Sequence, residues 1–293
     1  MRVLISGKGG LIGTALSELL AERGHEAVAL ERGGQGGGRT WSIEERRVSD
    51  NALEGIDAVV HLSGKPIFPP FTEGRKRVIL NSRRMGTSLI AEAVAKHRPD
   101  VFISASGIGY YGDRGDEVLT EDSGPGSGFL ADVVVEWERA CQPARDAGVR
   151  TVNIRTGLVM SAESTLIKLM SLPFKVGLGG RVGDGKQWWS WISLEDEVRA
   201  ILHCLEDESL VGPVNLTAPT PVRNQDFAKT LGKVLNRPSA VPVPAFALKL
   251  VLGPEAAEEL VLASQRVSPE RLIATGFQFE HPGIEEGLRA AFS

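Results

Sequence analysis

Three hydroxyl side chains, Ser106, Tyr110 and Tyr111, follow a buried strand that the apolar run at 101–106 predicts. A serine hydroxyl can hydrogen-bond a substrate oxygen, and a tyrosine phenol can exchange a proton with it. Ligands of open parallel sheets bind beyond the carboxyl ends of the strands, so these side chains are candidate catalytic groups. In the alternative interpretation, the hydroxyls satisfy their own turn and the two rings are packed aromatic residues.

A glycine-spaced turn near the N-terminus is a second candidate site. A short apolar run at 3–5 leads into Gly7, Gly10 and Gly13, and leucines then recur at helical spacing. Gly7 permits a sharp turn, Gly10 lets backbone approach a pyrophosphate, and Gly13 lets the helix lie close to the strand. The free N–H groups and the dipole of the helix favour phosphate, so the spacing predicts dinucleotide binding. The alternative is an ordinary strand-to-helix turn.

Two charged residues of opposite sign, Glu31 and Arg32, follow a second predicted strand at 27–30. They lie near the distance of about 20 residues at which a side chain that reads the ribose is expected. A carboxylate there hydrogen-bonds the 2′-hydroxyl of NAD, whereas an arginine attracts the 2′-phosphate of NADP. We expect NADP as the cofactor, with NAD as the alternative.

The elements that position these groups alternate between strand and helix. Strands are predicted at 3–6, 27–30, 56–62, 101–106 and 151–155, with helices at 11–23, 73–97 and 128–147 among them. This alternation predicts an α/β fold, a Rossmann-type doubly wound parallel sheet. We expect an NAD(P)-binding domain at 1–160, which also receives segments near 190–217. Residues 161–293 would form mainly a smaller C-terminal substrate lobe, with helices that include 245–252 and 255–267.

Two stretches are candidates for contact with a substrate. Trp188, Trp189 and Trp191 follow a glycine-rich loop and predict a pocket wall or lid, with a packing cluster under that loop as the alternative. Lys65 begins a proline-rich loop after the strand at 56–62 and is a candidate for the substrate lip.

Composition excludes several classes of function. The 293 residues are 42% hydrophobic and 24% charged, with a formal net charge of −4, so there is no electrostatic case for nucleic acid or an anionic membrane surface. Cys141 and Cys204 lack metal-ligand spacing, and we expect neither a metal site nor a disulfide. We expect no signal peptide, because Met1 and Arg2 lead directly into the first predicted strand, and no apolar run approaches the length of a membrane span; we therefore expect a cytoplasmic protein.

Several separated motifs together carry a resemblance to a known family. They are Gly7-Lys8-Gly9-Gly10-Leu11-Ile12-Gly13, His61-Leu62-Ser63-Gly64, Asn81-Ser82-Arg83, Ser106 through Gly112, Arg155-Thr156-Gly157-Leu158-Val159 and Trp191-Ile192-Ser193-Leu194-Glu195-Asp196. The whole chain resembles the extended short-chain dehydrogenase/reductase superfamily, and closely its epimerase-like NADP-binding branch, sometimes labelled cell-division inhibitor, with its C-terminal domain of unknown function.

The resemblance implies a role for each matching residue. Ser106 matches the catalytic Ser/Thr of the superfamily, and homodimers are common in it. The implied cofactor contacts are the backbone from Lys8 through Gly9, Gly10 and Leu11 to Ile12, then Leu62 and Ser63 at the adenosine and ribose, Gly64 beside them, Arg83, Ser104 and Ala105, and Leu158 and Val159 at the nicotinamide.

The sequence departs from the family pattern where chemistry is expected. Phe129 and Val133 stand where the superfamily places a catalytic Tyr and a Lys four residues later. Three interpretations remain open: an oxidoreductase in which Tyr110 or Tyr111 supplies the acid; an enzyme whose proton comes from substrate, water or the loop at Lys65; and a nucleotide-binding regulator without turnover that acts through a protein partner. For an enzyme, the expected reaction is hydride transfer between the nicotinamide and a small carbonyl or alcohol substrate.

Overall fold

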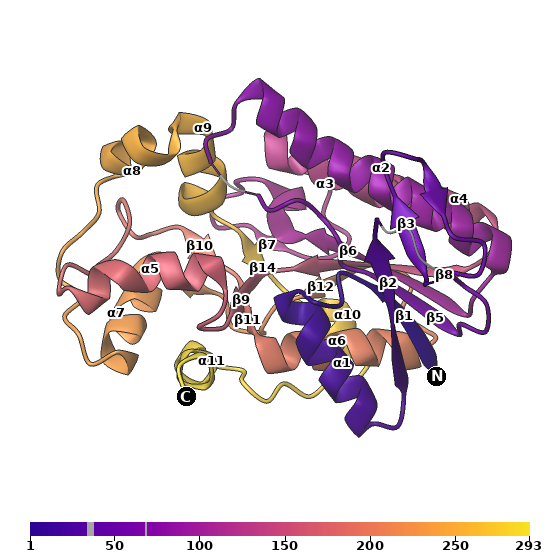
Figure 1. The fold of residues 1–293 in the computed structure, drawn as a ribbon. Coiled ribbons are helices and arrows are strands. Elements are labelled where there is room, and N and C mark those ends of the chain that lie inside the picture. The colour runs from indigo at the N-terminus through magenta and orange to yellow at the C-terminus, as the bar shows by residue number, and fades with distance from the viewer. Residues whose placement is uncertain (34–37, 68) are drawn as a thin grey trace.

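A computed structural model of the chain describes residues 1–33, 38–67 and 69–293 (Figure 1). Its centre is an eight-stranded sheet with the order β12-β8-β6-β5-β1-β2-β3-β4, in which every neighbouring pair is parallel except β3 and β4. The strands are β1 (Arg2–Ser6), β2 (Glu26–Arg32), β3 (Thr40–Ser42), β4 (Arg47–Val48), β5 (Ala58–His61), β6 (Val101–Gly107), β8 (Arg150–Thr156) and β12 (Gly212–Leu216).

The strand order confirms the predicted Rossmann-type fold. The chain runs outward from β1 to β2 on one side and from β5 to β6, β8 and β12 on the other. The order therefore reverses between β1 and β5, and the crevice at the carboxyl ends of these two strands is where such sheets bind ligands. The glycine turn follows β1, so the sequence places it at this crevice.

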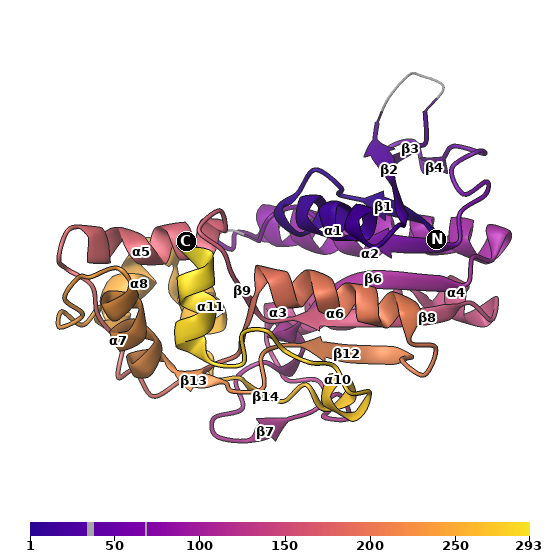
Figure 2. The same ribbon diagram turned by 90° about the horizontal axis from the view of Figure 1, so that it is seen from below.

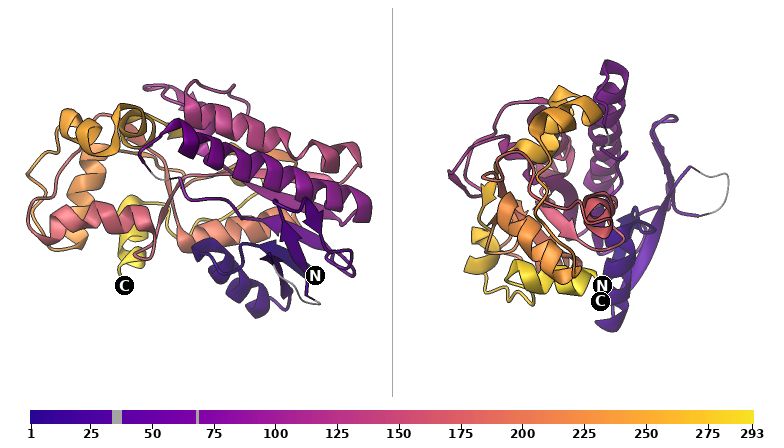
Figure 3. Two further views of the ribbon diagram at one scale, coloured as in Figure 1. Left: turned by 45° about the horizontal axis from the view of Figure 1, so that its top comes forward. Right: turned by 90° about the vertical axis from the view of Figure 1, so that its left-hand side faces the viewer.

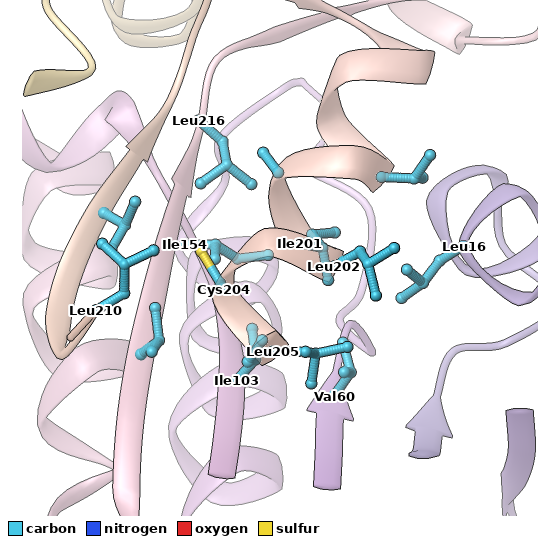
Figure 4. Packing of buried hydrophobic residues seen from close by; sticks show 14 of the residues in the cluster. Leu16, Val60, Ile103, Ile154, Ile201, Leu202, Cys204, Leu205, Leu210 and Leu216 are labelled. Carbon is cyan, nitrogen blue, oxygen red and sulfur yellow. The ribbon is translucent and has the colours of Figure 1, made fainter. Parts of the chain in front are cut away.

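Helices cover both faces of the sheet. On one face, α1 (Leu11–Glu22) and α6 (Leu194–Glu206) bury Leu16 and Ile201 against Val60 and Ile103 (Figure 4). On the other face lie α2 (Glu73–His97), α3 (Phe129–Arg139) and α4 (Gln142–Asp146), with α2 running along the length of the sheet domain (Figure 3). The apolar side chains of both faces are shielded from water, which stabilises the layered arrangement.

The prediction of one continuous helix at 128–147 is wrong. The structure divides it into α3 and α4, with the break at Ala140 and Cys141. Pro143 lies in the first turn of α4, where its missing N–H is tolerated, whereas inside a continuous helix it would remove a hydrogen bond. The helix at 73–97 is confirmed; the Thr72 side chain caps its first turn by accepting a hydrogen bond from the Arg75 N–H.

The C-terminal lobe packs beside the sheet domain and is joined to it through β9 (Figure 2). Its core gathers Trp189, Trp191, Phe227 and Leu288. The remaining elements are η1 (Ile108–Tyr111), β7 (Val118–Leu119), β9 (Leu158–Met160), α5 (Thr165–Lys175), β10 (Trp188–Trp189), β11 (Trp191–Ser193), β13 (Val222–Arg223), α7 (Asn224–Val234), α8 (Ala245–Leu252), α9 (Pro254–Ala257), η2 (Glu258–Leu262), β14 (Arg266–Val267), α10 (Glu270–Ala274) and α11 (Ile284–Ala291).

The helix predicted at 255–267 ends early. Helical structure stops at Leu262, and β14 then pairs with β7. In the extended segment between them, Ser264 Oγ donates to the Gly115 carbonyl at 2.6 Å and Gln265 Nε2 donates to the Ile108 carbonyl at 3.2 Å. The backbone N–H groups that a continued helix would use internally bond elsewhere: that of Ser264 donates to Asp113 Oδ1 at 3.2 Å, and that of Gln265 donates to the Trp188 carbonyl at 3.0 Å.

Candidate functional site

The glycine turn after β1 has the geometry of a phosphate cradle. Gly7 has a φ of 81°, which side chains disfavour, and a Cβ on Gly13 would lie 2.3 Å from the Gly7 carbonyl oxygen. Leu11 and Ile12 begin α1, and no side chain caps its first turn at Gly10. The N–H groups of that turn are therefore not taken up by a side-chain cap, and the helix dipole adds positive potential beside them.

A cavity of about 700 Å³ opens beside this turn. Ser63, which follows β5, lies close to the turn, because a Cβ on Gly7 would come within 3.2 Å of the Ser63 backbone nitrogen. The cavity is lined by Gly7, Lys8, Gly9, Thr14, Ser17, Glu18, Ala21, Ala29, Leu30, Glu31, Arg32 and Ser63. The structure thus brings the predicted turn, the end of β2 and the end of β5 together around one space, at the switch point of the sheet.

The charged side chains around this cavity are held differently. Lys8 donates from its Nζ to the Ala27 carbonyl at 2.9 Å, so its ammonium is tied to the edge of β2. Glu31 and Arg32 end β2 and are exposed at the cavity, and the Arg32 guanidinium lies 5.2 Å from the centre of the Trp41 ring. Arg32 therefore offers a positive charge at the place where the sequence predicts the ribose.

Sequence reasoning missed part of this wall. Thr14, Ser17, Glu18 and Ala21 on α1 line the cavity together with Ala29 and Leu30 on β2. Their positions in α1 are spaced by three and four residues, which places them on one side of a helix. That spacing could have identified the cavity-facing side of α1.

The end of β5 is buried polar structure. His61 is fully buried and its Nδ1 lies 2.5 Å from Ser6 Oγ, while its ring meets Trp41 edge-on. Burial lowers the pKa of His61 to about 3, so the imidazole is neutral at physiological pH. Leu62, Ser63 and Gly64 follow the strand; Ser63 lines the cavity, and Leu62 packs against the core of the sheet domain.

Arg83 lies beneath the turn that follows β5. Its guanidinium donates to the Lys65 carbonyl at 3.0 Å and lies 4.8 Å from the centre of the Trp137 ring. Burial lowers the pKa of Arg83 to about 10. A Cβ on Gly64 would lie 3.5 Å from this guanidinium, so Arg83 supports the backbone at Gly64 directly. The Lys65 side chain itself is exposed.

The end of β6 joins a buried ionic network. Ser106 Oγ donates to Glu138 Oε1 at 2.7 Å, and Arg155 donates to both oxygens of the same carboxylate at 2.8 and 2.9 Å. Burial opposes the charge of Arg155, but hydrogen bonds and charge attraction from Glu138 raise its pKa above its ordinary value. Ser104 is fully buried and Ala105 is half-buried in the same strand.

The two phenols of η1 differ sharply. The Tyr111 hydroxyl is buried, and its one proton has two acceptors within reach, Asn215 Oδ1 at 2.8 Å and the Thr120 carbonyl at 3.0 Å; its oxygen accepts from Arg155 at 3.0 Å. Burial raises the pKa of Tyr111. Tyr110 is half-buried, its ring lies 3.5 Å from the Arg155 guanidinium carbon, and its hydroxyl has no hydrogen bond to any residue that the structure describes. Of the two phenols, Tyr110 is therefore the one whose hydroxyl is not engaged within the described chain.

The start of α3, where the resemblance places Phe129, is capped from the C-terminal lobe. Glu259 of η2 accepts hydrogen bonds from the backbone N–H groups of Phe129 at 2.9 Å and Leu130 at 2.7 Å. The Phe129 ring packs edge-on against Phe71, with centres 5.2 Å apart, and Val133 is buried. No acid or base occupies the side-chain positions 129 and 133.

The three tryptophans have separate surroundings. Trp191 is fully buried and its ring fills the space beside Gly287, where a Cβ would approach it to 2.3 Å. Trp189 packs against Phe227. Trp188 lies between the guanidinium groups of Arg223 and Arg266, at 4.1 and 4.7 Å from its ring centre. Trp191 therefore belongs to the core, as the alternative interpretation holds.

A second cavity, of about 290 Å³, lies in the C-terminal lobe. Leu158 and Trp189 line it, whereas Val159 packs with the core of the sheet domain.

Within residues 1–33, 38–67 and 69–293, no group of three or more His, Cys, Asp or Glu side chains could hold a metal ion. In the same ranges, no helix has both the length and the apolar character needed to cross a membrane.

Comparison with known proteins agrees with this architecture. Residues 3–216 match the sequence profile of the NAD dependent epimerase/dehydratase family. The chain belongs to that family. Residues 243–291 match a second profile, described as a domain of unknown function, DUF1731. Both matches confirm the family resemblance that the motifs carry.

Relatives of this epimerase family chain cover its whole length. Epimerase family protein Mb2239 of Mycobacterium bovis is 40% identical over 289 residues, covering 98% of this chain and 96% of the relative. Epimerase family protein SDR39U1 of Homo sapiens is 34% identical, covering 99% of each chain.

Solved structures show the same fold. The crystal structure of human SDR39U1 (isoform 2) with NADPH has a TM-score of 0.89 at 33% identity and covers all of both chains. The Thermus thermophilus UDP-glucose 4-epimerase complex with NAD has a TM-score of 0.77 at 19% identity, covering 99% of this chain and 97% of that one, and shows the fold alone.

Proposed function

We propose that the protein binds NADP(H) at the 700 Å³ cavity and transfers hydride between the cofactor and a small carbonyl or alcohol substrate. The observation that carries the proposal is the crowding at Gly13, where a Cβ would strike the Gly7 carbonyl at 2.3 Å. This close packing brings the N-terminus of α1 next to the end of β1, and it lets a pyrophosphate approach the backbone of the turn. The relative human SDR39U1, crystallised with NADPH, supports the choice of cofactor.

The residues around the cavity fit the parts of a dinucleotide. In the proposal, the backbone from Lys8 to Ile12 holds the pyrophosphate, and Arg32 holds the 2′-phosphate of NADPH. Leu62, Ser63 and Gly64 border the adenosine half, with Arg83 supporting their backbone. Glu31 would hydrogen-bond the ribose hydroxyl of NAD, so NAD is the weaker alternative.

When bound, the nicotinamide donates or accepts a hydride at its C4 atom. Chemistry at a carbonyl or carbinol oxygen also needs a group that gives and takes a proton. Of the two phenols, we propose Tyr110 for this role, because its hydroxyl is free of partners in the described chain while that of Tyr111 is fully engaged. Ser106 Oγ donates its one proton to Glu138, so it would donate to a substrate carbonyl oxygen only after leaving Glu138.

Further expectations accompany the proposed function. Leu158 and Val159 would lie at the nicotinamide, with Ser104 and Ala105 beneath it. The boundary at 160, a homodimeric assembly and a cytoplasmic location stay predictions.

The test is a titration of the purified protein with NADPH and NADH, followed by fluorescence transfer from tryptophan to nicotinamide. We expect saturable binding that is tighter for NADPH, and loss of that binding in Gly13→Ala. Absence of binding by either nucleotide to a folded wild-type protein would contradict the proposal.

A further inference from the structure

The 290 Å³ cavity of the C-terminal lobe has an almost wholly apolar wall. It lies among α5, α7, α8 and η2, which gather at one end of the molecule (Figure 1). The lining residues are Leu158, Leu166, Leu169, Met170, Pro173, Phe174, Gly180, Val182, Trp189, Asn224, Phe227, Ala228, Val243, Leu248, Leu252, Leu260 and Val261. Of these side chains none carries a charge, so the wall offers no counter-charge to a phosphate or a carboxylate.

Asn224 contributes the one polar side chain of this wall. It is 1% exposed, and its Oδ1 accepts a hydrogen bond from the Val182 N–H at 2.7 Å. Its Nδ2 donates to no residue in the part of the chain that the structure describes. An oxygen on a bound molecule would give this donor a partner.

One residue of the cavity wall, Leu158, comes shortly after a strand of the central sheet. Leu158 begins β9 two residues after β8 ends at Thr156, and it pairs with Trp191 of β11. The resemblance places Leu158 at the nicotinamide, and the structure places it in the cavity wall. One residue therefore borders both the expected reacting end of the cofactor and the apolar space.

The size of the cavity limits what it accepts. Its volume is about twice the ~150 Å³ of a cavity that holds benzene. This is room for two fused rings or a medium-length alkyl chain, and too little for a protein segment.

We infer that this cavity is the substrate site and that the substrate is a neutral, apolar alcohol, aldehyde or ketone carrying an alkyl or aromatic group. The inference rests on the proposed hydride transfer and narrows its substrate class. It disfavours nucleotide sugars as substrates, because their diphosphate would find no cationic side chain among the lining residues.

The test uses the neutral fluorescent probe N-phenylnaphthylamine on the full-length protein, with and without NADPH. We expect saturable binding of the probe, displacement by decanol, and no displacement by UDP-glucose. Two leucines of α5 supply a matched pair: Leu169 lines the cavity and is 51% exposed, whereas Leu172 does not line it and is 54% exposed. Leu169→Asp should weaken probe binding about tenfold or more, and Leu172→Asp should leave it unchanged.

The outcomes separate this inference from the proposed function. If NADPH binds and the probe does not, the inference is overturned while the proposed cofactor site stands. If the probe binds and NADPH does not, the proposed function fails. Equal weakening by Leu169→Asp and Leu172→Asp would place the probe on a general apolar surface and overturn the inference, as would displacement by UDP-glucose. Leu252→Asp and Leu250→Asp on α8 repeat the comparison, since Leu252 lines the cavity and Leu250 is 86% exposed outside it.

Discussion

Ser106 and Glu138 are joined by a 2.7 Å hydrogen bond in which the serine hydroxyl donates to the carboxylate. The same carboxylate neutralises Arg155, whose side chain is 3% exposed. The position of the serine hydroxyl is therefore fixed by a charged residue of α3 as well as by its own strand, and a change at Glu138 affects both the network and the candidate site.

Glu138→Ala should lower the free energy of unfolding by about 3–5 kcal/mol, because it leaves the buried Arg155 charge without its partner. Equilibrium unfolding in urea measures the change. The control is Glu136→Ala on the same helix, which removes an exposed pair with Arg139 and should cost less than about 1 kcal/mol. Equal losses of unfolding free energy in the two variants would show that the buried pair stabilises the protein no more than the exposed one.

Tyr111→Phe should destabilise the protein by about 1–3 kcal/mol, since it strips the buried Asn215 and Thr120 oxygens and the Arg155 guanidinium of a partner. Tyr110→Phe should leave stability nearly unchanged but lower turnover about a hundredfold or more. Urea unfolding and steady-state oxidation of NADPH with a substrate from the displacement screen test the two effects. Full turnover in Tyr110→Phe would remove Tyr110 as the acid.

Arg32→Ala should weaken NADPH binding by about 1.5–3 kcal/mol and NADH binding much less, through loss of a charge-assisted phosphate contact. The fluorescence titration with both nucleotides measures the difference. Arg47→Ala, on exposed β4 and outside the cavity wall, is the control and should affect neither. An equal effect of Arg32→Ala on both nucleotides would refute the assignment of this residue to the 2′-phosphate.

Gly13→Ala should abolish nucleotide binding and destabilise the fold, because its Cβ would overlap the Gly7 carbonyl at 2.3 Å. Gly9→Ala should fold as well as the wild type, since a Cβ there meets no atom within 4 Å. Thermal unfolding compares the two variants. A Gly13→Ala protein with wild-type stability and NADPH affinity would show that close approach at this turn is not required.

Glu197→Gln should stabilise the protein increasingly as pH rises from 5 to about 8. Burial raises the pKa of Glu197 from 4.5 to about 8, so the folded state keeps a proton that the unfolded chain releases, and stability falls by up to about 1.4 kcal/mol per pH unit. Glutamine cannot ionise and lacks this loss. Burial of neutral His61 has the opposite effect, because stability rises with pH below about 6.5 as the unfolded imidazole loses its proton. This effect is the same in Glu197→Gln and the wild type, so it cancels in their difference in stability.

Urea unfolding of Glu197→Gln and wild type at pH 5, 6, 7 and 8 measures that difference in stability. Glu195→Gln, at a more exposed position of α6, is the control and should lack the gain in stability that Glu197→Gln shows as pH rises from 6 to 8. A constant difference for Glu197→Gln as well would mean that Glu197 is ionised in the folded protein.

The parts of the site that sequence patterns predict are those fixed by local geometry. Gly7 and Gly13 are needed for the shape of one turn, and the end of β2 is set by its own apolar run, so both could be placed from residue spacing. The partner of Ser106 lies 32 residues away on another element, and the cap of Phe129 lies 130 residues away. Such pairings depend on how the helices pack against the sheet, and residue spacing within one segment does not predict that packing.

The cap that Glu259 places on Phe129 also bears on how the chain matures. The acceptor for the N–H groups in the first turn of α3, Glu259, is synthesised 130 residues after Phe129. Similarly, the Asn215 side chain donates to the Ser268 carbonyl at 2.9 Å, tying the last strand of the sheet to a late segment. The nucleotide-binding half therefore gains these contacts only after translation has passed Ser268, and a chain truncated before Glu259 would leave two N–H groups at the start of α3 without this acceptor.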